Sequence, residues 1–302
     1  MAKAMTPQRA ELWCAEKLID MLENADLPPW RKPWNAGKDL PRNAKTNRPY
    51  SGMNMWMLLL SPYNDKRFLT PKQVKDAGGN IKKGEKTFPV FFWSFPTPEE
   101  QKQGKRPFCR GYKVVNIEQT EGVDLSKLKS TNESDIEAHE HSPIEACEAI
   151  VKGFESKPRI EHMGNQACYS PSMDVVKMPE MKTFGKVEEY YSTLFHELGH
   201  STGHESRLDR PELMSNLASF GSHAYSQEEL VAEFTAAMLC GEAGIEPATL
   251  ENSAAYIKSW HSKLKRDPEC LVMAVRNANK AVRLILNKDV EDKKKKKEEK
   301  AA

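Results

Sequence analysis

The residues of this chain best suited to chemistry are His196, Glu197 and His200, which form a His-Glu-x-x-His motif. Side chains four residues apart lie on one face of a helix, so both imidazoles can reach one metal ion. Glu197 would then lie beside the ion, placed to take a proton from water and pass it to a leaving amine. Residues 187–195 are apolar on one helical face, which predicts a buried helix here. The alternative is two surface histidines on either side of a charged residue.

A hydrolytic zinc site needs a third protein ligand and a coordination position left open for water. The longer motif HExxHxxGxxH would supply a third histidine, but Ser206 stands at its last position. His204 follows His200 by four residues but lies about two turns from His196, so a straight helix rarely lets all three hold one ion. The third ligand is therefore expected from a different helix.

The helix predicted over residues 227–241 offers that ligand. Glu229 and Glu233 are four residues apart and share one face of this otherwise apolar segment. We expect Glu229 to bind the metal, with Glu228 as the fallback, and Glu233 to orient a ligating histidine. The competing interpretation is that Ser226 and Glu229 form a capping box at the start of the helix.

Further residues are expected around the metal without binding it. His204 shares a helix face with His200, and Tyr225 is a candidate hydrogen-bond donor to the transition state. Residues 168–178 predict two strands joined by the turn SPSMD. Such a segment can supply an edge strand that pairs with an extended peptide substrate. The alternative is an ordinary hairpin.

The charge of the chain is divided between its two halves. Residues 1–120 carry 21 Lys and Arg against 12 Asp and Glu, a net charge of +9. Residues 121–287 carry 17 against 26, a net charge of −9. This asymmetry indicates two domains with different partners.

The basic half combines positive charge with aromatic side chains, as single-stranded nucleic acid requires. Cations follow the phosphates, aromatic faces stack on the bases, and polar side chains add hydrogen bonds. The candidate DNA-binding residues are Trp30, Arg31, Lys32, Trp34, Arg42, Asn43, Lys45, Thr46, Arg48, Tyr50, Asn54, Lys82, Lys83 and Lys86. The alternative is that the aromatic residues are core and the lysines are only solvated.

The pattern of the whole chain predicts an α+β protein. Helices are expected over 6–24, 53–60, 70–78, 143–156, 186–204, 227–241, 252–265 and 269–287. Aromatic and β-branched runs predict paired strands over 86–95 and 110–117. We expect two domains, 1–125 and 144–287, joined by an acidic linker over 126–143 and followed by a charged, disordered tail over 288–302.

Several segments resemble the ArdC antirestriction proteins of conjugative plasmids. In the C-terminal half these are YSPSMDVVKMP, YYSTLFHELGHSTGHESRLDR and YSQEELVAEFTAAMLC. In the N-terminal half they are Pro33-Trp34, Pro41-x-Asn43, residues 46–52 followed by x-Asn54, Thr70-x-x-Gln73, Gly78-Gly79, residues 83–86 and residues 114–119. Two residues depart from the family pattern, because Asn47 occupies a turn position often held by glycine and Val115 replaces a common aromatic residue.

The resemblance implies a fold and a function. It implies a small mixed α/β domain that binds single-stranded DNA, and a mainly helical zincin-like metallopeptidase domain with a small sheet. It also implies protection of incoming plasmid DNA against host restriction during conjugation. The expected cofactor is one divalent metal ion, zinc with manganese as the alternative. The expected partners are single-stranded DNA and an unidentified protein substrate, for which a host restriction component is a candidate.

The composition excludes several other classes. No apolar run approaches the roughly 20 residues that cross a bilayer, and the expected partners include no membrane. The six cysteines are scattered without a Cys-x-x-Cys pair, which favours a reducing, cytoplasmic location. Two rivals stay open: a DNA-binding protein whose metal site is idle, and a peptidase whose N-terminal half recognises protein. A nuclease is disfavoured because magnesium sites are rich in oxygen ligands.

Overall fold

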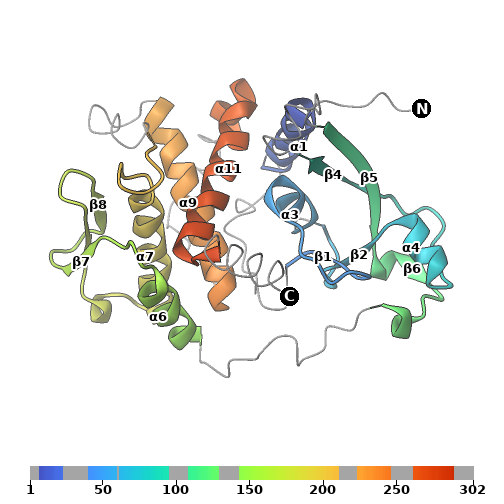
Figure 1. Ribbon diagram of the computed structural model, residues 1–302, viewed down its shortest axis with the longest axis horizontal. Helices are drawn as coiled ribbons and strands as arrows, with labels where there is room; N and C mark the ends of the chain where they lie inside the picture. The colour runs from blue at the N-terminus through green and yellow to red at the C-terminus, as the bar shows by residue number, and fades with distance from the viewer. Residues whose placement is uncertain are drawn as a thin grey trace, which may run out of the picture. The chain divides into compact units, whose positions relative to one another are not determined.

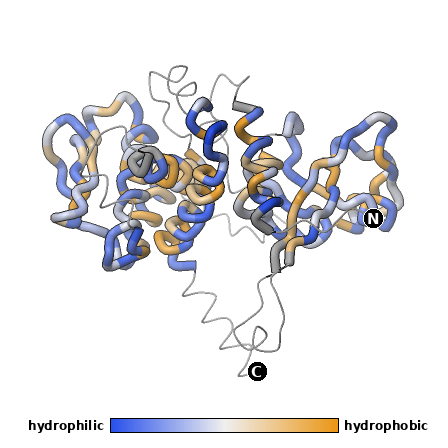
Figure 2. Tube along the Cα trace, turned by 90° about the horizontal axis from the view of Figure 1, so that it is seen from above, coloured by the Kyte–Doolittle hydropathy of each residue, from blue (hydrophilic) through white to orange (hydrophobic). Residues whose placement is uncertain are grey.

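The computed structural model describes residues 7–22, 40–59, 61–94, 108–128, 143–210, 223–245 and 261–288. These residues fall into two compact units, one within residues 7–128 and one within residues 143–288. Each unit contains helices and strands, and in each the hydrophobic residues gather where elements pack together (Figure 2). The predicted α+β fold is confirmed. No described helix is both long enough and apolar enough to span a membrane.

The N-terminal unit is built on a mixed four-stranded sheet in the order β1-β2-β5-β4, with α1 beside β5 and α3 beside β4 (Figure 1). Its elements are α1 (Pro7–Leu22), β1 (Arg42–Asn43), α3 (Gly52–Leu59), β2 (Arg67–Leu69), α4 (Pro71–Asp76), β3 (Asn80–Ile81), β4 (Phe88–Ser94), β5 (Phe108–Asn116), η2 (Ile117–Gln119), β6 (Thr120–Glu121) and η3 (Leu125–Lys127). The long strands β4 and β5 are antiparallel, with Phe88 opposite Val114. The predicted pairing of the two aromatic strands is therefore confirmed.

The sequence predicts none of the short strands β1, β2, β3 and β6. Strand β1 is parallel to β2, β2 is antiparallel to β5, and β3 pairs with β6 in a separate ribbon. Each strand has only two or three residues, which is too few for an alternating pattern to be recognised. This unit also extends past residue 125, because Leu128 is 6% exposed and packs in the core with Leu69 and Val74.

Asn54 joins α3 to the outer edge of β4. Its side-chain amide donates to the carbonyl of Phe91 at 2.6 Å, and its side-chain oxygen accepts from the N–H of Phe91 at 2.9 Å. Asn54 is 8% exposed. It therefore satisfies backbone groups on a terminal strand of the sheet, a structural role that the sequence did not suggest, while its contact with DNA stays a prediction.

The C-terminal unit consists of helices with a three-stranded sheet in the order β7-β9-β8 (Figure 1). Its elements are α6 (Pro143–Gly153), β7 (Arg159–His162), β8 (Cys168–Ser170), β9 (Val175–Met178), η4 (Met181–Thr183), α7 (Val187–Ser201), α9 (His223–Ala243) and α11 (Pro268–Ile285). Strands β8 and β9 form the predicted hairpin, whereas β7, parallel to β9, is missing from the prediction. Most of the helix expected over 252–265 lies outside the described residues, as does the tail from residue 289 on.

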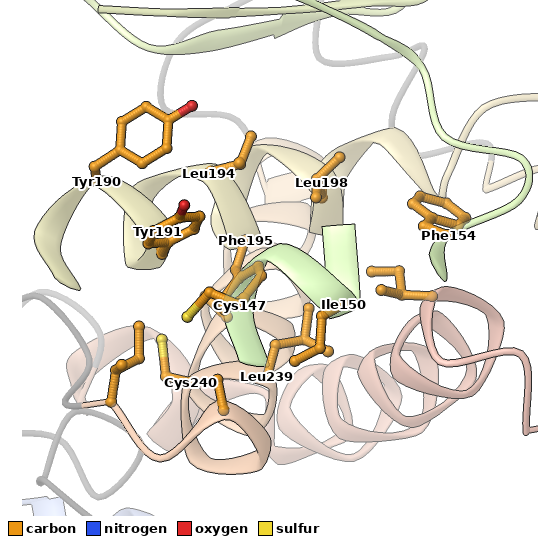
Figure 3. Packing of buried hydrophobic residues seen from close by; sticks show 14 of the residues in the cluster. Cys147, Ile150, Phe154, Tyr190, Tyr191, Leu194, Phe195, Leu198, Leu239 and Cys240 are labelled. Atoms are coloured by element: carbon orange, nitrogen blue, oxygen red, sulfur yellow. The ribbon is translucent and has the colours of Figure 1, made fainter. Parts of the chain in front are cut away.

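The core of the C-terminal unit holds α7 in place from one side. Tyr191 and Phe195 of α7 pack with Cys147 and Ile150 of α6 and with Leu239 of α9 (Figure 3). These side chains form a stripe at helical spacing, and each residue of a helix turns by about 100°. The histidines of the motif therefore project from the opposite side of α7.

We predict that Asn54→Ala destabilises the N-terminal unit. The change leaves the N–H and the carbonyl of Phe91 without partners, at a cost of about 2–4 kcal/mol in the free energy of unfolding. Urea unfolding followed by tryptophan fluorescence measures this cost. The control is Lys83→Ala, an exposed position, which should change stability by less than about 0.5 kcal/mol. Equal stability of the two variants would contradict the structural role of Asn54.

Candidate metal centre

The two histidines of the motif lie one helical turn apart on α7 and face each other. Their Nε2 atoms are 3.2 Å apart, and their ring centroids are 4.8 Å apart. The side chain of His196 is 22% exposed and that of His200 is 12% exposed. This pair is therefore partly sheltered, with both Nε2 atoms directed to one point, as the spacing predicts.

Helix α9 brings Glu229 to the same point. One carboxylate oxygen lies 3.6 Å from Nε2 of His196, and the other lies 3.5 Å from Nε2 of His200. Among the described residues, His196, His200 and Glu229 form a group whose ligand atoms all lie within 4.8 Å of one another. The predicted third ligand is thus placed with the two histidines.

The approach of α9 to α7 depends on Gly199, inside the motif. A Cβ atom at this position would lie 3.1 Å from Cα of Ala232 and 3.2 Å from Cβ of Thr235. Both neighbours belong to α9, and contacts that short force packed atoms apart. The absence of a side chain at residue 199 therefore lets the second helix come close enough to supply Glu229.

The alternatives for Glu229 are decided by where α9 begins. The helix starts at His223, so Ser226 lies inside it and cannot be the N-cap of a capping box with Glu229. Glu228, the fallback ligand, is 1% exposed and lies outside the converging group. Tyr225 lies in the first turn of α9, and its side chain is outside the described residues.

The charges of the three converging side chains are strongly coupled. Burial acts to lower the pKa of each histidine, but hydrogen bonds with neighbouring carboxylates outweigh it, and both pKa values are raised. Burial acts to raise the pKa of Glu229, but its hydrogen bonds with His196 and His200 hold that pKa well below its usual range. The group is therefore a negative carboxylate beside two imidazoles that attract protons, an environment that suits a cation.

The donor set fits a divalent metal ion. Two imidazole nitrogens and one carboxylate oxygen are the ligands of catalytic zinc sites that keep a position open. Glu197 is 8% exposed and directly follows His196 in the chain, and its charge acts to raise the pKa of both histidines. Glu233, 9% exposed, likewise acts on the pKa of His196.

His200 has an orienting carboxylate that the sequence patterns did not predict. Glu228 lies with its Oε1 atom 3.4 Å from Nδ1 of His200, and Glu233 acts on the other histidine, His196. Both oxygens of Glu228 accept hydrogen bonds from the guanidinium of Arg210. Arg210 is not among the predicted site residues, because no spacing rule connects an arginine ten residues after the motif to an acid on the next helix.

His204 does not join the site as expected. Helix α7 ends at Ser201, not at residue 204, so His204 no longer shares a helix face with His200. Its Nδ1 atom lies 2.8 Å from the hydroxyl of Ser206 and accepts from the N–H of that residue at 3.2 Å. His204 therefore shapes the turn that follows the helix.

The β8–β9 hairpin is tied to the end of α7 by Arg207. Its guanidinium donates to the carboxylate of Asp174, to the hydroxyl of Tyr169 at 3.1 Å and to the carbonyl of Ser201 at 2.7 Å. The hydrogen bond from Arg207 lowers the pKa of Asp174, a residue in the left-handed region with φ 48°. The network fixes β8, a terminal strand of its sheet, relative to the helix that carries the motif.

Two of the expected DNA-binding residues in the N-terminal unit, Asn43 and Thr46, stabilise a turn. The side-chain oxygen of Asn43 accepts from the N–H groups of Lys45 and Thr46, at 3.2 and 3.1 Å, and from the hydroxyl of Thr46 at 3.2 Å. The amide of Asn43 donates to Gln73 at 3.0 Å. Asn47, in the same turn, has φ 57°, the conformation for which glycine is common.

The other expected DNA-binding residues differ in how available they are. Arg48, Lys83 and Lys86 are exposed. The remaining described ones have partners within the unit: Arg42 with Leu40 and Asn47, Lys45 with Asp76, Tyr50 with Phe68, and Lys82 with Glu118, although Lys45 and Lys82 are also exposed. The residues outside the described part of the chain are Trp30, Arg31, Lys32 and Trp34.

An exposed aromatic surface on β4 and β5 is absent from the sequence prediction. Phe92 is 56% exposed and Tyr112 is 42% exposed. Arg110, also exposed, is opposite Phe92, and Tyr112 is opposite Val90. Residues two apart share a face of a strand, so Phe92, Arg110 and Tyr112 lie on one face. The alternating pattern could have identified them, but only once the strand register was known.

Two family models match the chain in the order of its two units. Residues 9–133 match the N-terminal domain of the anti-restriction factor ArdC. Residues 145–277 match a zincin-like metallopeptidase. Similarity to a DNA primase, TraC of Escherichia coli, is 34% identity over 95% of this chain, although the chain spans only 28% of that primase.

Solved structures of the antirestriction protein ArdC from plasmid R388 are similar over almost the whole chain. The metal-free structure is 31% identical with a TM-score of 0.68, and the match covers 91% of this chain and 96% of that one. The Mn(II)-bound structure is 30% identical with a TM-score of 0.71, and the match covers 92% and 97%. The resemblance read from the motifs is confirmed: this chain belongs to the ArdC family of antirestriction proteins, with an N-terminal ArdC domain and a zincin-like metallopeptidase domain.

Proposed function

We propose that this protein protects incoming plasmid DNA during conjugation through two activities. The N-terminal unit binds single-stranded DNA, and the C-terminal unit hydrolyses a protein with the help of one divalent metal ion. The observation that carries the proposal is the convergence of His196, His200 and Glu229 on one point, with Glu197 beside the histidines.

The three converging side chains would hold the metal ion. When bound, the ion would polarise a peptide carbonyl and make water more acidic. Zinc is the usual ion for two histidines and one glutamate. The same ligand types accept manganese, and Mn(II) is bound in one structure of the R388 protein.

Glu197 is the residue proposed to move the proton. It follows His196 directly on a helix held rigidly by the core, so its position relative to the histidines is fixed. A carboxylate beside the ion can accept a proton from the attacking water and return it to the leaving nitrogen.

A polypeptide is the substrate class that suits the C-terminal unit. The net charge of −9 over residues 121–287 repels the phosphates of DNA. Strand β8 ends its sheet in the described residues and packs beside α7. An extended peptide can add to such an edge through backbone hydrogen bonds. A host restriction component is the candidate protein.

The proposal for DNA rests on the charge and the exposed aromatic residues of the N-terminal unit. Residues 1–120 carry a net charge of +9. Phe92 and Tyr112 present ring faces on one side of β4 and β5, with Arg110 beside them. Bases stack on such rings, and the guanidinium can contact phosphate or base.

We predict that adding Zn²⁺ or Mn²⁺ to chelator-treated protein raises its melting temperature. An ion that binds only the folded state stabilises it by about 2.7 kcal/mol at a concentration 100 times the Kd. Glu229→Gln should remove most of this stabilisation, whereas Glu242→Gln, an exposed acid on the same helix, should keep it. Differential scanning calorimetry measures both. Equal stabilisation of the two variants would exclude Glu229 as a ligand.

We predict that Glu197→Gln abolishes peptide hydrolysis while metal binding stays within a few-fold of the parent. Loss of a general base lowers the rate by about 10²–10⁴-fold, which mass spectrometry of a peptide library can measure. Glu188→Gln, in the first turn of the same helix, is the control.

The same pair of variants tests the link to antirestriction in a conjugation assay. Loss of protection by Glu197→Gln alone supports the peptidase role. Full protection by this variant would instead show that DNA binding suffices and that the metal site is catalytically idle.

We predict that Phe92→Ala and Tyr112→Ala weaken the binding of single-stranded oligonucleotides. Each lost stacking contact costs about 1–3 kcal/mol, so each variant should raise the Kd about 5- to 150-fold. Leu125→Ala is the control: Leu125 belongs to the same unit and, like Phe92, is 56% exposed. This variant should leave the Kd unchanged. Fluorescence anisotropy at two salt concentrations checks this, because phosphate contacts weaken as salt rises. Unchanged affinity of both aromatic variants would place the DNA elsewhere.

A further inference from the structure

We infer that Arg210 and Glu228 form a positioning pair that fixes His200 and sets the distance between the two helices that carry the metal ligands. The inference rests on the proposed metal site but not on peptidase activity. Neither residue touches the converging point itself. Both are buried, with side chains 5% and 1% exposed.

The first step is the contact between the two side chains. Nε of Arg210 donates to Oε2 of Glu228 at 2.9 Å, and Nη2 donates to Oε1 at 2.5 Å. This is a two-pronged arrangement in which the flat guanidinium matches the flat carboxylate. It restricts rotation of the Glu228 carboxylate, and it offsets a negative charge that is costly to bury alone.

The second step is the contact of the same guanidinium with α7. Nη1 of Arg210 donates to the hydroxyl of Thr202 at 2.7 Å, and Nη2 donates to the carbonyl of Gly199 at 3.0 Å. The positive charge therefore lies at the C-terminal end of α7, where it is favourable. One arginine thus bridges the end of α7, which carries the histidines, to the beginning of α9, which carries Glu229.

The third step is the contact of Glu228 with a metal ligand. Its Oε1 atom lies 3.4 Å from Nδ1 of His200. A carboxylate at that position keeps the proton on Nδ1 and leaves the lone pair of Nε2 for the ion. Nε2 is the atom that lies 3.5 Å from Glu229 and 3.2 Å from His196. The pair therefore determines both the tautomer and the direction of this imidazole.

Gly203 provides the space for the guanidinium. A Cβ atom at this position would lie 2.9 Å from Nη2 and 3.0 Å from Cζ of Arg210. Gly203 is not among the glycines with positive φ, so its backbone does not require glycine. The buried guanidinium does, because its hydrogen bonds to Glu228, Thr202 and Gly199 leave it no room to move aside.

The alternative is that the Arg210–Glu228 pair only stabilises the fold. Arg207 provides the control for this alternative. Arg207 is also a buried arginine at the end of α7, with its side chain 3% exposed. It donates to the carbonyls of Ser201 and Ser156. It makes no contact with a residue of the converging group in the described part of the chain. Loss of either arginine should lower stability, but only loss of the Arg210–Glu228 pair should alter metal binding.

The experiment uses the full chain and measures the Kd for Zn²⁺ and for Mn²⁺ by calorimetry. The test variants are Glu228→Gln and Gly203→Ala, and the controls are Arg207→Lys and Gly153→Ala. Gly153 has open space around its Cβ position. We expect Glu228→Gln to weaken metal binding about 10- to 100-fold, the usual effect of removing the partner of a ligating histidine. Gly203→Ala should weaken it in the same direction, and neither control should.

The visible absorption spectrum of bound Co²⁺ gives a second readout. A change in the stability of the fold alone does not alter this spectrum. It should change for Glu228→Gln and Gly203→Ala and stay as in the parent for the controls. Unchanged affinity and spectrum in both test variants would overturn the inference, as would equal weakening by Arg207→Lys. If Glu228→Gln fails to fold, Gly203→Ala decides the question. A parent chain that binds no ion would overturn the metal site itself, which is a different and recognisable result.

Discussion

The close packing of α7 against α9 is the constraint on which the metal centre depends. Two ligands come from one helix and the third from the other, so the separation of the helices acts directly on the distances between donor atoms. Gly199 permits the approach because a Cβ atom there would lie only 3.1 Å from Cα of Ala232 and 3.2 Å from Cβ of Thr235. The same packing buries the acids Glu197, Glu228 and Glu233. Buried carboxylates need compensating charge, which Arg210 supplies on one side and which a divalent cation would supply on the other.

One side of helix α7 packs in the core, and the opposite side carries residues of the metal site. The side that carries Tyr191 and Phe195 packs in the core with α6 and α9, and it fixes the position and the rotation of the helix. The opposite side carries the histidines, and there the packing leaves the rings partly open. Ligands held on such a rigid element need little reordering when an ion binds, which favours both affinity and a defined geometry. One short segment therefore carries both the hydrophobic side chains that fix the helix and two of the side chains that converge on the metal site.

Sequence patterns predicted the parts of this protein that depend on local spacing. The pair of histidines, the acid between them and the long antiparallel strands all follow from periodicity within one segment. Glu229 is predicted because the site needs a third ligand and the next predicted helix offers a carboxylate. Helix α9 starts at His223, so Glu229 cannot form the competing capping box with Ser226. The pattern was insufficient wherever a contact joins distant segments. Arg210 meets Glu228 across 18 residues, and Asn54 meets Phe91 across 37. From the sequence alone, a polar residue in a basic segment suggests a surface contact. Asn54 is instead buried against the backbone of Phe91, which no local pattern places beside it.

The joining of the two units in one chain bears on how the proposed activities would work together. When two binding units belong to one chain, the second binding event becomes intramolecular, which raises the effective concentration of its partner. A peptidase carried by a unit that stays on single-stranded DNA would therefore meet proteins acting on that DNA far more often than proteins free in solution. Such a peptidase needs little intrinsic affinity for its substrate, and weak affinity limits damage to other proteins. The opposite net charges of the halves, +9 and −9, suit this proposed division, since DNA would be attracted to one unit and repelled by the other. Selectivity for the protein substrate would then come as much from where the enzyme is held as from the contacts around its metal.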